Sequence, residues 1–313
     1  MKPSISICIP TYQRPIFLKA ALHSVLEQSL QPSEIIIGDD SHDDITEKIV
    51  LDIKENCEIP IFYTRHSPSL GQAGNVNFLY DKAQGHKIVL LHDDDLLLPN
   101  AIEDLNNCWN MHPDLIAAYG KQYIISEEGE VNLEESHNLN QMFFRTSDYA
   151  GLQKSSLEVA ILHQFPSNGY MVLASAAKFI RYRPYQEVGT GCDFDFSLRL
   201  SLEYSNFFFL DKYTAKYRLS NTSVSKSSND DAAAQSFNIV LTTNVPEELS
   251  WAKEYELKRS APIAIVQLID LGKRKQALDI YFSKYHPWSS RFSLGGVRRL
   301  IKAFLPRTIG KLI

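Results

Sequence analysis

Three consecutive acidic residues are the strongest chemical signal in this sequence. Asp93, Asp94 and Asp95 follow directly after the apolar run Ile88-Val89-Leu90-Leu91. Neighbouring carboxylates repel one another, and a helix N-cap would need only one of them. A divalent cation relieves this repulsion, and oxygen ligands suit Mg²⁺ or Mn²⁺. The triplet therefore predicts a metal or ligand site rather than a simple helix cap.

Two further polar clusters follow predicted strands. The stretch from Thr11 to Arg14 comes after the first strand, and Asp39-Asp40-Ser41 comes after the second. In an open α/β sheet, ligands bind beyond the carboxyl ends of the strands, so parallel strands would bring these clusters and the acidic triplet to one edge. Asp39 and Asp40 could equally cap the helix that follows them.

A fourth cluster, GTGCDFD, spans residues 189–195 and leads into a predicted helix. Its first acidic residue, Asp193, stands where a helix N-cap is expected, so the spacing alone favours a structural role for it.

The first 120 residues alternate between strand-like and helix-like patterns. Runs of β-branched residues predict buried strands, and apolar residues at helical spacing predict amphipathic helices. The predicted strands are residues 4–9, 34–38, 59–65 and 87–91, and the predicted helices are residues 15–28, 44–56, 72–84 and 99–111. This alternation predicts a parallel sheet with helices on both faces.

The pattern loosens after residue 115. Residues 115–125 predict a strand that enters a hairpin with its tip at residues 127–130, and residues 155–162, 193–202 and 247–285 predict helices. Residues 220–229 are small and polar, which predicts a flexible loop.

Composition and charge restrict the class of protein. The chain has 313 residues, 44% of them hydrophobic, and a formal net charge of −5. These values exclude a disordered, collagen-like or coiled-coil chain and argue against a nucleic-acid partner. Four cysteines without a CxxC pair predict reduced thiols and a cytoplasmic protein. The first fifteen residues predict no signal peptide, and the apolar runs are too short to span a membrane.

The C-terminal segment 291–313 differs from the rest of the chain. It holds six Lys or Arg residues and no acidic residue. Leu300, Ile301, Phe304 and Leu305 recur at helical spacing beside basic residues, a pattern that suits the surface of an anionic membrane. The alternative is a terminal helix that packs its apolar face on the body of the protein. Membrane binding by this segment would make the chain a peripheral protein on the inner face of the cell membrane.

Together these motifs resemble family 2 glycosyltransferases of the GT-A fold. The resemblance rests on SISICIPTYQRP, EIIIGDDSHDD, GQAGNVN with KIVLLHDDDLLLP, and GCDFDFSLRL, in that order, and covers residues 4–225. It implies a Rossmann-like, mostly parallel α/β sheet flanked by helices, with a helical C-terminal extension. The implied domains are a catalytic domain 1–225, with a nucleotide-sugar half 1–120 and an acceptor half 121–225. The remainder, 226–313, would be a flexible loop and a helical region with the basic amphipathic tail.

The resemblance also implies roles for individual residues. Asp95, with Asp93, would ligate Mn²⁺ or Mg²⁺, and Asp193 would be the general base. The residues implied to bind the donor nucleotide are Pro10, Thr11, Tyr12, Arg14, Asp39, Asp40, Asn77 and Asp94. The implied reaction is an inverting, metal-dependent transfer of a hexosyl or N-acetylhexosaminyl group. The donor would be a nucleotide diphosphate sugar, with UDP as the expected nucleotide. The acceptor would be a glycan or a lipid-linked saccharide in surface polysaccharide synthesis.

The chain departs from the family's usual pattern at four positions. His92 stands where Asp is usual, Val76 where Arg is frequent and Cys192 where Glu is common. Ser220 stands where the family often carries a His. Two other functions therefore stay open: a non-catalytic protein that binds nucleotide sugars or glycans, and a metal-dependent phosphotransferase or hydrolase.

Overall fold

The computed structural model describes residues 4–219 and 231–305. The chain separates into two compact units. The first consists of Met1–Tyr182 with Phe196–Ser220, and the second of Arg183–Asp195 with Asn221–Ile313. The domain boundary predicted at residue 225 and the loop predicted at residues 220–229 both fall outside the described residues.

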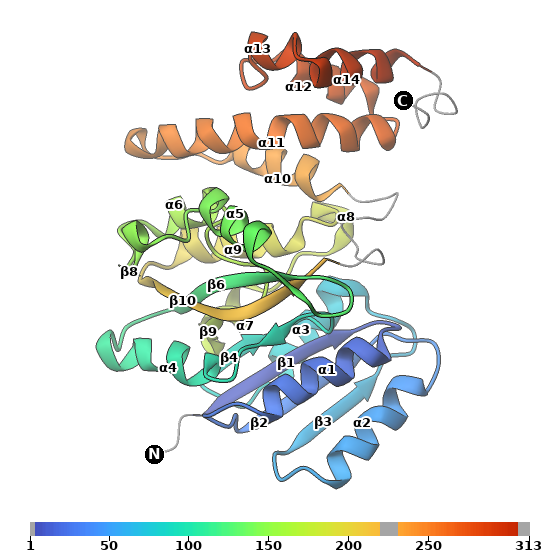
Figure 1. Cartoon of the computed structure of the whole chain (residues 1–313), viewed down its shortest axis with the longest axis vertical. Coiled ribbons are helices and arrows are strands. Elements are labelled where there is room, and N and C mark those ends of the chain that lie inside the picture. Colours follow the sequence, from blue (N-terminus) through green and yellow to red (C-terminus); the bar gives the residue numbers. More distant parts are fainter. Residues whose placement is uncertain (1–3, 220–230, 306–313) are drawn as a thin grey trace. The chain divides into compact units, whose positions relative to one another are not determined.

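The first unit opens with the predicted alternation of strands and helices (Figure 1). These elements are β1 (Ile5–Thr11), α1 (Pro15–Leu26), β2 (Glu34–Asp39), α2 (Ile45–Glu55), β3 (Ile61–Arg65), α3 (Gly71–Lys82) and β4 (Lys87–Leu90). The four strands are parallel and lie in the order β3-β2-β1-β4. Every residue of β2 is buried, as its unbroken run of isoleucines predicts. Figure 1 shows α1 and α2 on the near side of these strands and α3 on the far side.

The other half of the sheet is mixed. The short strand β9 (Met171–Leu173) pairs antiparallel with both β4 and β6 (Ala117–Ile125), and so joins the two halves. Beyond it, β10 (Phe207–Arg218) runs parallel to β6, with register shifts between Leu210 and Ala215. The edge strands are β5 (Leu96–Leu97), β7 (Val131–Asn132) and β8 (Gly151–Leu152). The β6–β7 pair forms the hairpin predicted around residues 127–130.

Further helices flank the second half of the sheet. They are α4 (Ala101–Met111), α5 (Leu133–Met142), α6 (Ser156–Ile161), α7 (Ala174–Ile180) and α9 (Cys192–Glu203), with a 3₁₀ turn at Ser147–Tyr149. The buried core draws on α1, α4 and strands β1, β2 and β4. The fold class predicted from the sequence is therefore confirmed by the mostly parallel sheet and its helices.

The second unit is helical. It contains α8 (Tyr185–Val188), α10 (Ala232–Thr242), α11 (Ser250–Asp270), α12 (Arg274–Tyr281), α13 (Trp288–Arg291) and α14 (Leu294–Phe304), with a 3₁₀ turn at Glu247–Leu249. The sequence predicts one helical stretch over 247–285, but the chain breaks at Gly272, whose φ of +78° ends α11. Among the described residues, no helix is both long and apolar enough to cross a membrane.

Candidate active site

The acidic triplet and the loop after β1 lie together at the carboxyl ends of parallel strands. Thr11 donates a hydrogen bond from Oγ1 to Oδ2 of Asp93, at 2.7 Å. The Tyr12 backbone N–H donates to the same oxygen, at 3.3 Å. Arg14 reaches Asp94 Oδ2 at 2.7 Å and Asp93 Oδ1 at 3.4 Å. The convergence predicted for these two clusters is thus present in the fold.

Asp93 is occupied by these contacts. Burial, and then the charge of Asp94, raise the pKa of Asp93 to about 6, while Arg14 and the hydrogen bond from Thr11 act in the opposite direction. Both carboxylate oxygens of Asp93 accept hydrogen bonds from the loop after β1. Asp93 therefore fastens this loop to the acidic triplet.

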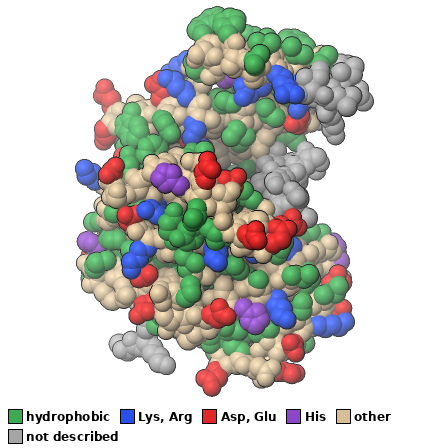
Figure 2. Space-filling model, in the orientation of Figure 1, with side chains coloured by type: hydrophobic (Ala, Val, Ile, Leu, Met, Phe, Trp, Pro, Cys, Tyr) green, Lys and Arg blue, Asp and Glu red, His purple; other side chains and the backbone are tan. Residues whose placement is uncertain are grey.

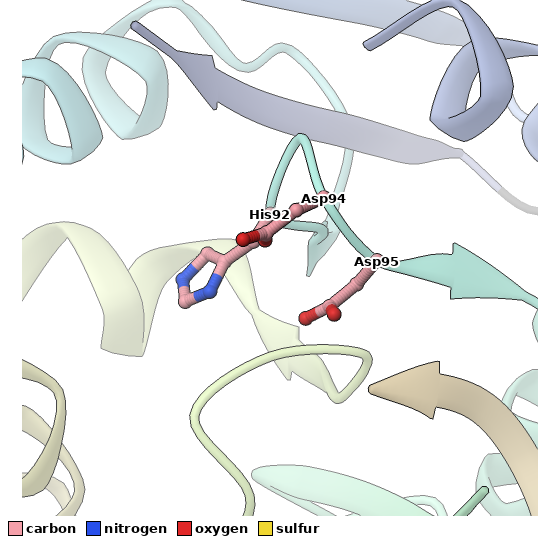
Figure 3. A group of neighbouring side chains, drawn as sticks. All are labelled: His92, Asp94 and Asp95. Carbon is pink, nitrogen blue, oxygen red and sulfur yellow. The ribbon is translucent and has the colours of Figure 1, made fainter. Parts of the chain in front are cut away.

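A second group beside Asp93 has the composition of a metal site. One potential ligand atom from each of His92, Asp94 and Asp95 lies within 4.8 Å of the others. Figure 3 shows that all three side chains come from the turn between β4 and β5, with the Asp95 carboxylate extending toward the other two. Two carboxylates and an imidazole are a donor set that first-row divalent cations accept.

The surroundings of Asp95 test whether these three residues suit a divalent cation. Its side chain is fully buried, and Oδ1 accepts a hydrogen bond from the Arg218 backbone N–H at 2.8 Å. Oδ2 is buried and has no hydrogen-bond partner among the residues that the structure describes. Burial, and then the charge of Asp94, hold the pKa of Asp95 well above its ordinary value. A buried carboxylate oxygen without a donor is costly, and a bound cation would satisfy it. The three residues therefore fit Mn²⁺ or Mg²⁺.

Arg218 is a further residue of this site, and no role for it was predicted from the sequence. Besides its bond to Asp95, it donates from Nε to the Asp94 carbonyl at 2.8 Å and from Nη1 to the Glu127 carbonyl at 2.7 Å. Its guanidinium also lies 4.8 Å from the ring centre of Phe17. Arg218 ends β10, so the signal that could have found it is its place at a strand end.

Asp39 and Asp40 lie at the end of β2 and hold neighbouring loops. Asp39 accepts hydrogen bonds from the Tyr63 hydroxyl at 2.7 Å and from the Ser41 N–H at 2.8 Å. Asp40 accepts one from the Leu70 N–H at 2.9 Å, directly before α3. Burial, and then the bond to Asp39, raise the pKa of Tyr63 above its ordinary range. Neither aspartate caps α2, whose N-cap position is Asp44.

The other residues predicted to bind the donor nucleotide differ in their surroundings. Tyr12 is half exposed, and its ring meets His42 edge-on at 5.7 Å. Pro10 stands opposite Gly38, one position before the last pair of β1 and β2. Asn77 exchanges two hydrogen bonds with the Tyr182 backbone, at 2.9 and 2.8 Å, so its amide is engaged within the protein.

Asn75 is a second residue that sequence reasoning missed. Its Nδ2 donates to the Gly38 carbonyl at 2.8 Å, and a Cβ at Gly38 would collide with its side chain. Of the two asparagines in α3, Asn75 is therefore the one that meets the end of β2, directly before Asp39. The signal was its position in the GQAGNVN motif.

The division between the two units falls within α9, and the predicted base, Asp193, belongs to the part of this helix in the second unit. It lies in the first turn of α9 and is half-buried. Asp195, in the same turn, is buried and bound by Arg183, whose Nε donates to Oδ2 at 3.0 Å and whose Nη2 reaches Oδ1. Both carboxylate oxygens of Asp195 are thus engaged by Arg183, so of the two aspartates Asp193 is the candidate base.

Comparison with known protein families shows the family of this chain. The sequence profile of the family described as glycosyl transferase family 2 matches residues 6–167. This chain belongs to that family. The matched region includes the loop after β1, the Asp39-Asp40 pair and the acidic triplet, whereas Asp193 and Arg218 lie beyond it.

Curated relatives of this family 2 member match part of its length. A GalNAc(5)-diNAcBac-PP-undecaprenol β-1,3-glucosyltransferase of Campylobacter jejuni is 31% identical over 33% of this chain and 33% of its own. The abequosyltransferase RfbV of Salmonella typhimurium is 30% identical over 46% of this chain and 42% of its own. The chain thus spans about a third to two fifths of the length of these relatives.

Solved structures resemble this family 2 member over nearly its whole length. Staphylococcus aureus TarS in complex with UDP-GlcNAc has a TM-score of 0.60 at 16% identity, over 96% of this chain and 79% of that one. The mannosyltransferase PcManGT of Pyrobaculum calidifontis, in complex with GDP-Man and Mn²⁺, has a TM-score of 0.61 at 14% identity, over 98% and 88%. At such low identity the likeness shows the fold, and it confirms the predicted GT-A architecture.

Proposed function

We propose that this protein transfers a sugar from a nucleotide diphosphate donor, a UDP-sugar, to a saccharide acceptor with inversion at the anomeric carbon. The observation that carries the proposal is the buried, unpartnered oxygen of Asp95 beside His92 and Asp94. This cluster meets the loop after β1 through the Arg14–Asp94 ion pair, and it lies within the region that matches the family. Family membership supports sugar transfer as the reaction.

The donor nucleotide would be bound by the clusters that follow β1 and β2. Each oxygen of Asp39 accepts one hydrogen bond within the protein and can accept another, so we assign to Asp39 the N3–H of uracil. Tyr12 offers a half-exposed aromatic face for the base or ribose. Arg14 balances the charges of Asp93 and Asp94 and keeps the loop in place.

A divalent cation would be held by His92, Asp94 and Asp95. When bound, it would neutralise the negative charge that develops on the departing nucleoside diphosphate. Asp93, predicted as a ligand, instead accepts hydrogen bonds from Thr11 and Tyr12, so we give it the role of positioning the triplet. Arg218 fixes Asp95 through its backbone N–H.

Asp193 would be the general base. It would take the proton of the acceptor hydroxyl as that oxygen attacks the anomeric carbon, a contribution of roughly 10²–10⁴-fold to the rate. Asp195 is held by Arg183, which supports the assignment of this role to Asp193 rather than to its neighbour.

We propose a glycan or lipid-linked saccharide as the acceptor, in surface polysaccharide synthesis, and a hexosyl or N-acetylhexosaminyl group as the sugar. The support is the Campylobacter relative, whose name gives an undecaprenol-linked saccharide, and the TarS complex with UDP-GlcNAc. We place the activity in the cytoplasm, because all four cysteines are free thiols, the state that a reducing compartment maintains.

A donor screen tests the proposal without an acceptor. Purified protein is incubated with UDP-, GDP- and dTDP-sugars in Mn²⁺, and nucleotide release by slow hydrolysis is measured. We expect release from one UDP-sugar, its loss on addition of a chelator, and a decrease of at least about 100-fold in Asp193→Asn with UDP binding retained.

Two results would contradict this function. Phosphate release from simple phosphomonoesters, without sugar release, would favour the metal-dependent phosphotransferase or hydrolase. Tight UDP-sugar binding with no turnover, across a broad panel of donors and acceptors, would favour the non-catalytic binding protein.

A further inference from the structure

Helix α14 presents its large apolar side chains to solvent. Leu294 is 93% exposed and Phe304 68%, and Val297 and Ile301 between them are exposed as well. These four residues recur at intervals of three or four, so they form one face of the helix. Amphipathic helices of globular proteins normally turn such a face toward the core, and α14 does not.

The buried positions of α14 are small residues that pack inside the second unit. Gly296 and Ala303 are buried. A Cβ at Gly296 would collide with the carbonyl oxygens of Ser290 and Arg291, so the helix backbone lies close to the preceding turn. The orientation of α14 is therefore set by its small residues, and the exposed apolar face is a consequence of the packing.

The exposed face is accompanied by aromatic residues of α13 and the turn that follows it. Trp288 and Phe292 are 68% and 73% exposed, and their rings stack with centres 5.6 Å apart. Arg291 lies over the Trp288 ring at 4.9 Å and over the ring of exposed Phe282 at 5.9 Å. We call Trp288, Phe292, Leu294, Val297, Ile301 and Phe304 the α13–α14 patch.

Basic residues accompany the α13–α14 patch. Figure 2 shows hydrophobic side chains over α13 and α14 with Lys and Arg side chains beside them. Arg298 is exposed on α14, one residue from Val297. Lys302 forms an ion pair with Asp270 at 2.8 Å. The segment 291–313 contains no acidic residue. The patch thus combines apolar and cationic chemistry.

We propose that the α13–α14 patch docks on a membrane surface that contains anionic lipids. Apolar and aromatic side chains would enter the boundary between head groups and acyl chains, and the basic side chains would meet lipid phosphates. A second copy of this chain fits less well as the partner. A symmetric contact would place the basic surface around Arg298 against the same basic surface of the second copy. The proposal goes beyond the proposed sugar transfer and does not depend on it.

The test is flotation of the full-length protein with lipid vesicles, without any donor. We expect it to float with vesicles of phosphatidylglycerol and phosphatidylcholine and to bind far more weakly to phosphatidylcholine alone. The double variant Leu294→Ser/Phe304→Ser should bind at least about tenfold more weakly, because it lacks two large apolar side chains that lipid would bury. Arg298→Glu should weaken binding at least about fivefold, and less so in high salt.

A matched control is Phe179→Ser, which removes an aromatic ring of similar exposure, 66%, from α7 of the first unit. It should float like the wild type, and the thermal unfolding of all variants should match the wild type. Wild-type protein that stays at the bottom with anionic vesicles would overturn the proposal. So would a double variant that floats normally but changes its mass in analytical ultracentrifugation, because the patch would then join two copies of the chain.

Discussion

Among single residues, the three aspartates of the acidic triplet have different partners. Asp93 faces the loop after β1, whereas Asp94 and Asp95 share the cluster with His92. The sequence predicted that a charged triplet at a strand end forms a site, because the repulsion between neighbouring carboxylates is local. It could not predict which carboxylate faces which partner, because adjacent side chains in a tight turn point in directions that only the turn geometry fixes.

The cost of the buried Asp95 oxygen predicts the behaviour of one variant. Asp95→Asn removes a carboxyl group whose ionisation is penalised by burial, while the amide oxygen can still accept from the Arg218 N–H. In chelator, we expect this variant to be more stable than the wild type by about 1 kcal/mol in denaturant unfolding.

The control for this variant is Asp52→Asn, which changes an exposed aspartate on α2 and should leave the stability unchanged within about 0.5 kcal/mol. A metal-free Asp95→Asn protein that is clearly less stable than the wild type would show that the Asp95 carboxylate is satisfied within the fold.

At the scale of elements, the sequence predicted the parts that local patterns control. Strands β1 to β4 and helices α1 to α4 follow from β-branched runs, helical spacing and turn residues. Strand β9 has three residues, Met171–Leu173, and its pairing with β4 and β6 comes from distant parts of the chain. No local pattern marks such a strand. The break at Gly272 had a local signal, a glycine before a basic stretch.

Two adjacent glycines test the orientation of α14. Gly296→Ala places a methyl group against the carbonyls of Ser290 and Arg291, and should cost roughly 1–3 kcal/mol. Gly295→Ala meets nothing nearer than 3.6 Å, at the side chain of Arg299, and should stabilise the helix by up to about 1 kcal/mol.

The measurement is hydrogen exchange of the α14 amides by mass spectrometry, which reports local opening. Faster exchange in Gly296→Ala and equal or slower exchange in Gly295→Ala are expected. The reverse order would mean that α14 turns its other face toward the second unit.

At the scale of the whole molecule, the two units carry different parts of the proposed function. The first unit holds the clusters proposed to bind the nucleotide and the candidate cation site, and the second holds Asp193 and the α13–α14 patch. The net charge of −5 is an average over the chain, and it conceals the basic segment 291–313. The uneven distribution of charge is consistent with different roles for the two units. The sequence predicted the family and the carboxyl-edge site, but the outward orientation of the apolar face depends on tertiary packing.

The proposed nucleotide-sugar site depends on a cation held by His92, Asp94 and Asp95. Its most direct test is calorimetric titration of UDP into the full-length protein, with and without Mn²⁺, for the wild type and Asp95→Asn. We expect Mn²⁺ to increase the affinity of the wild type for UDP by at least about tenfold, ~1.4 kcal/mol, and to have no such effect on the variant. Equal affinities with and without Mn²⁺ in the wild type, or an undiminished Mn²⁺ effect in Asp95→Asn, would contradict this site.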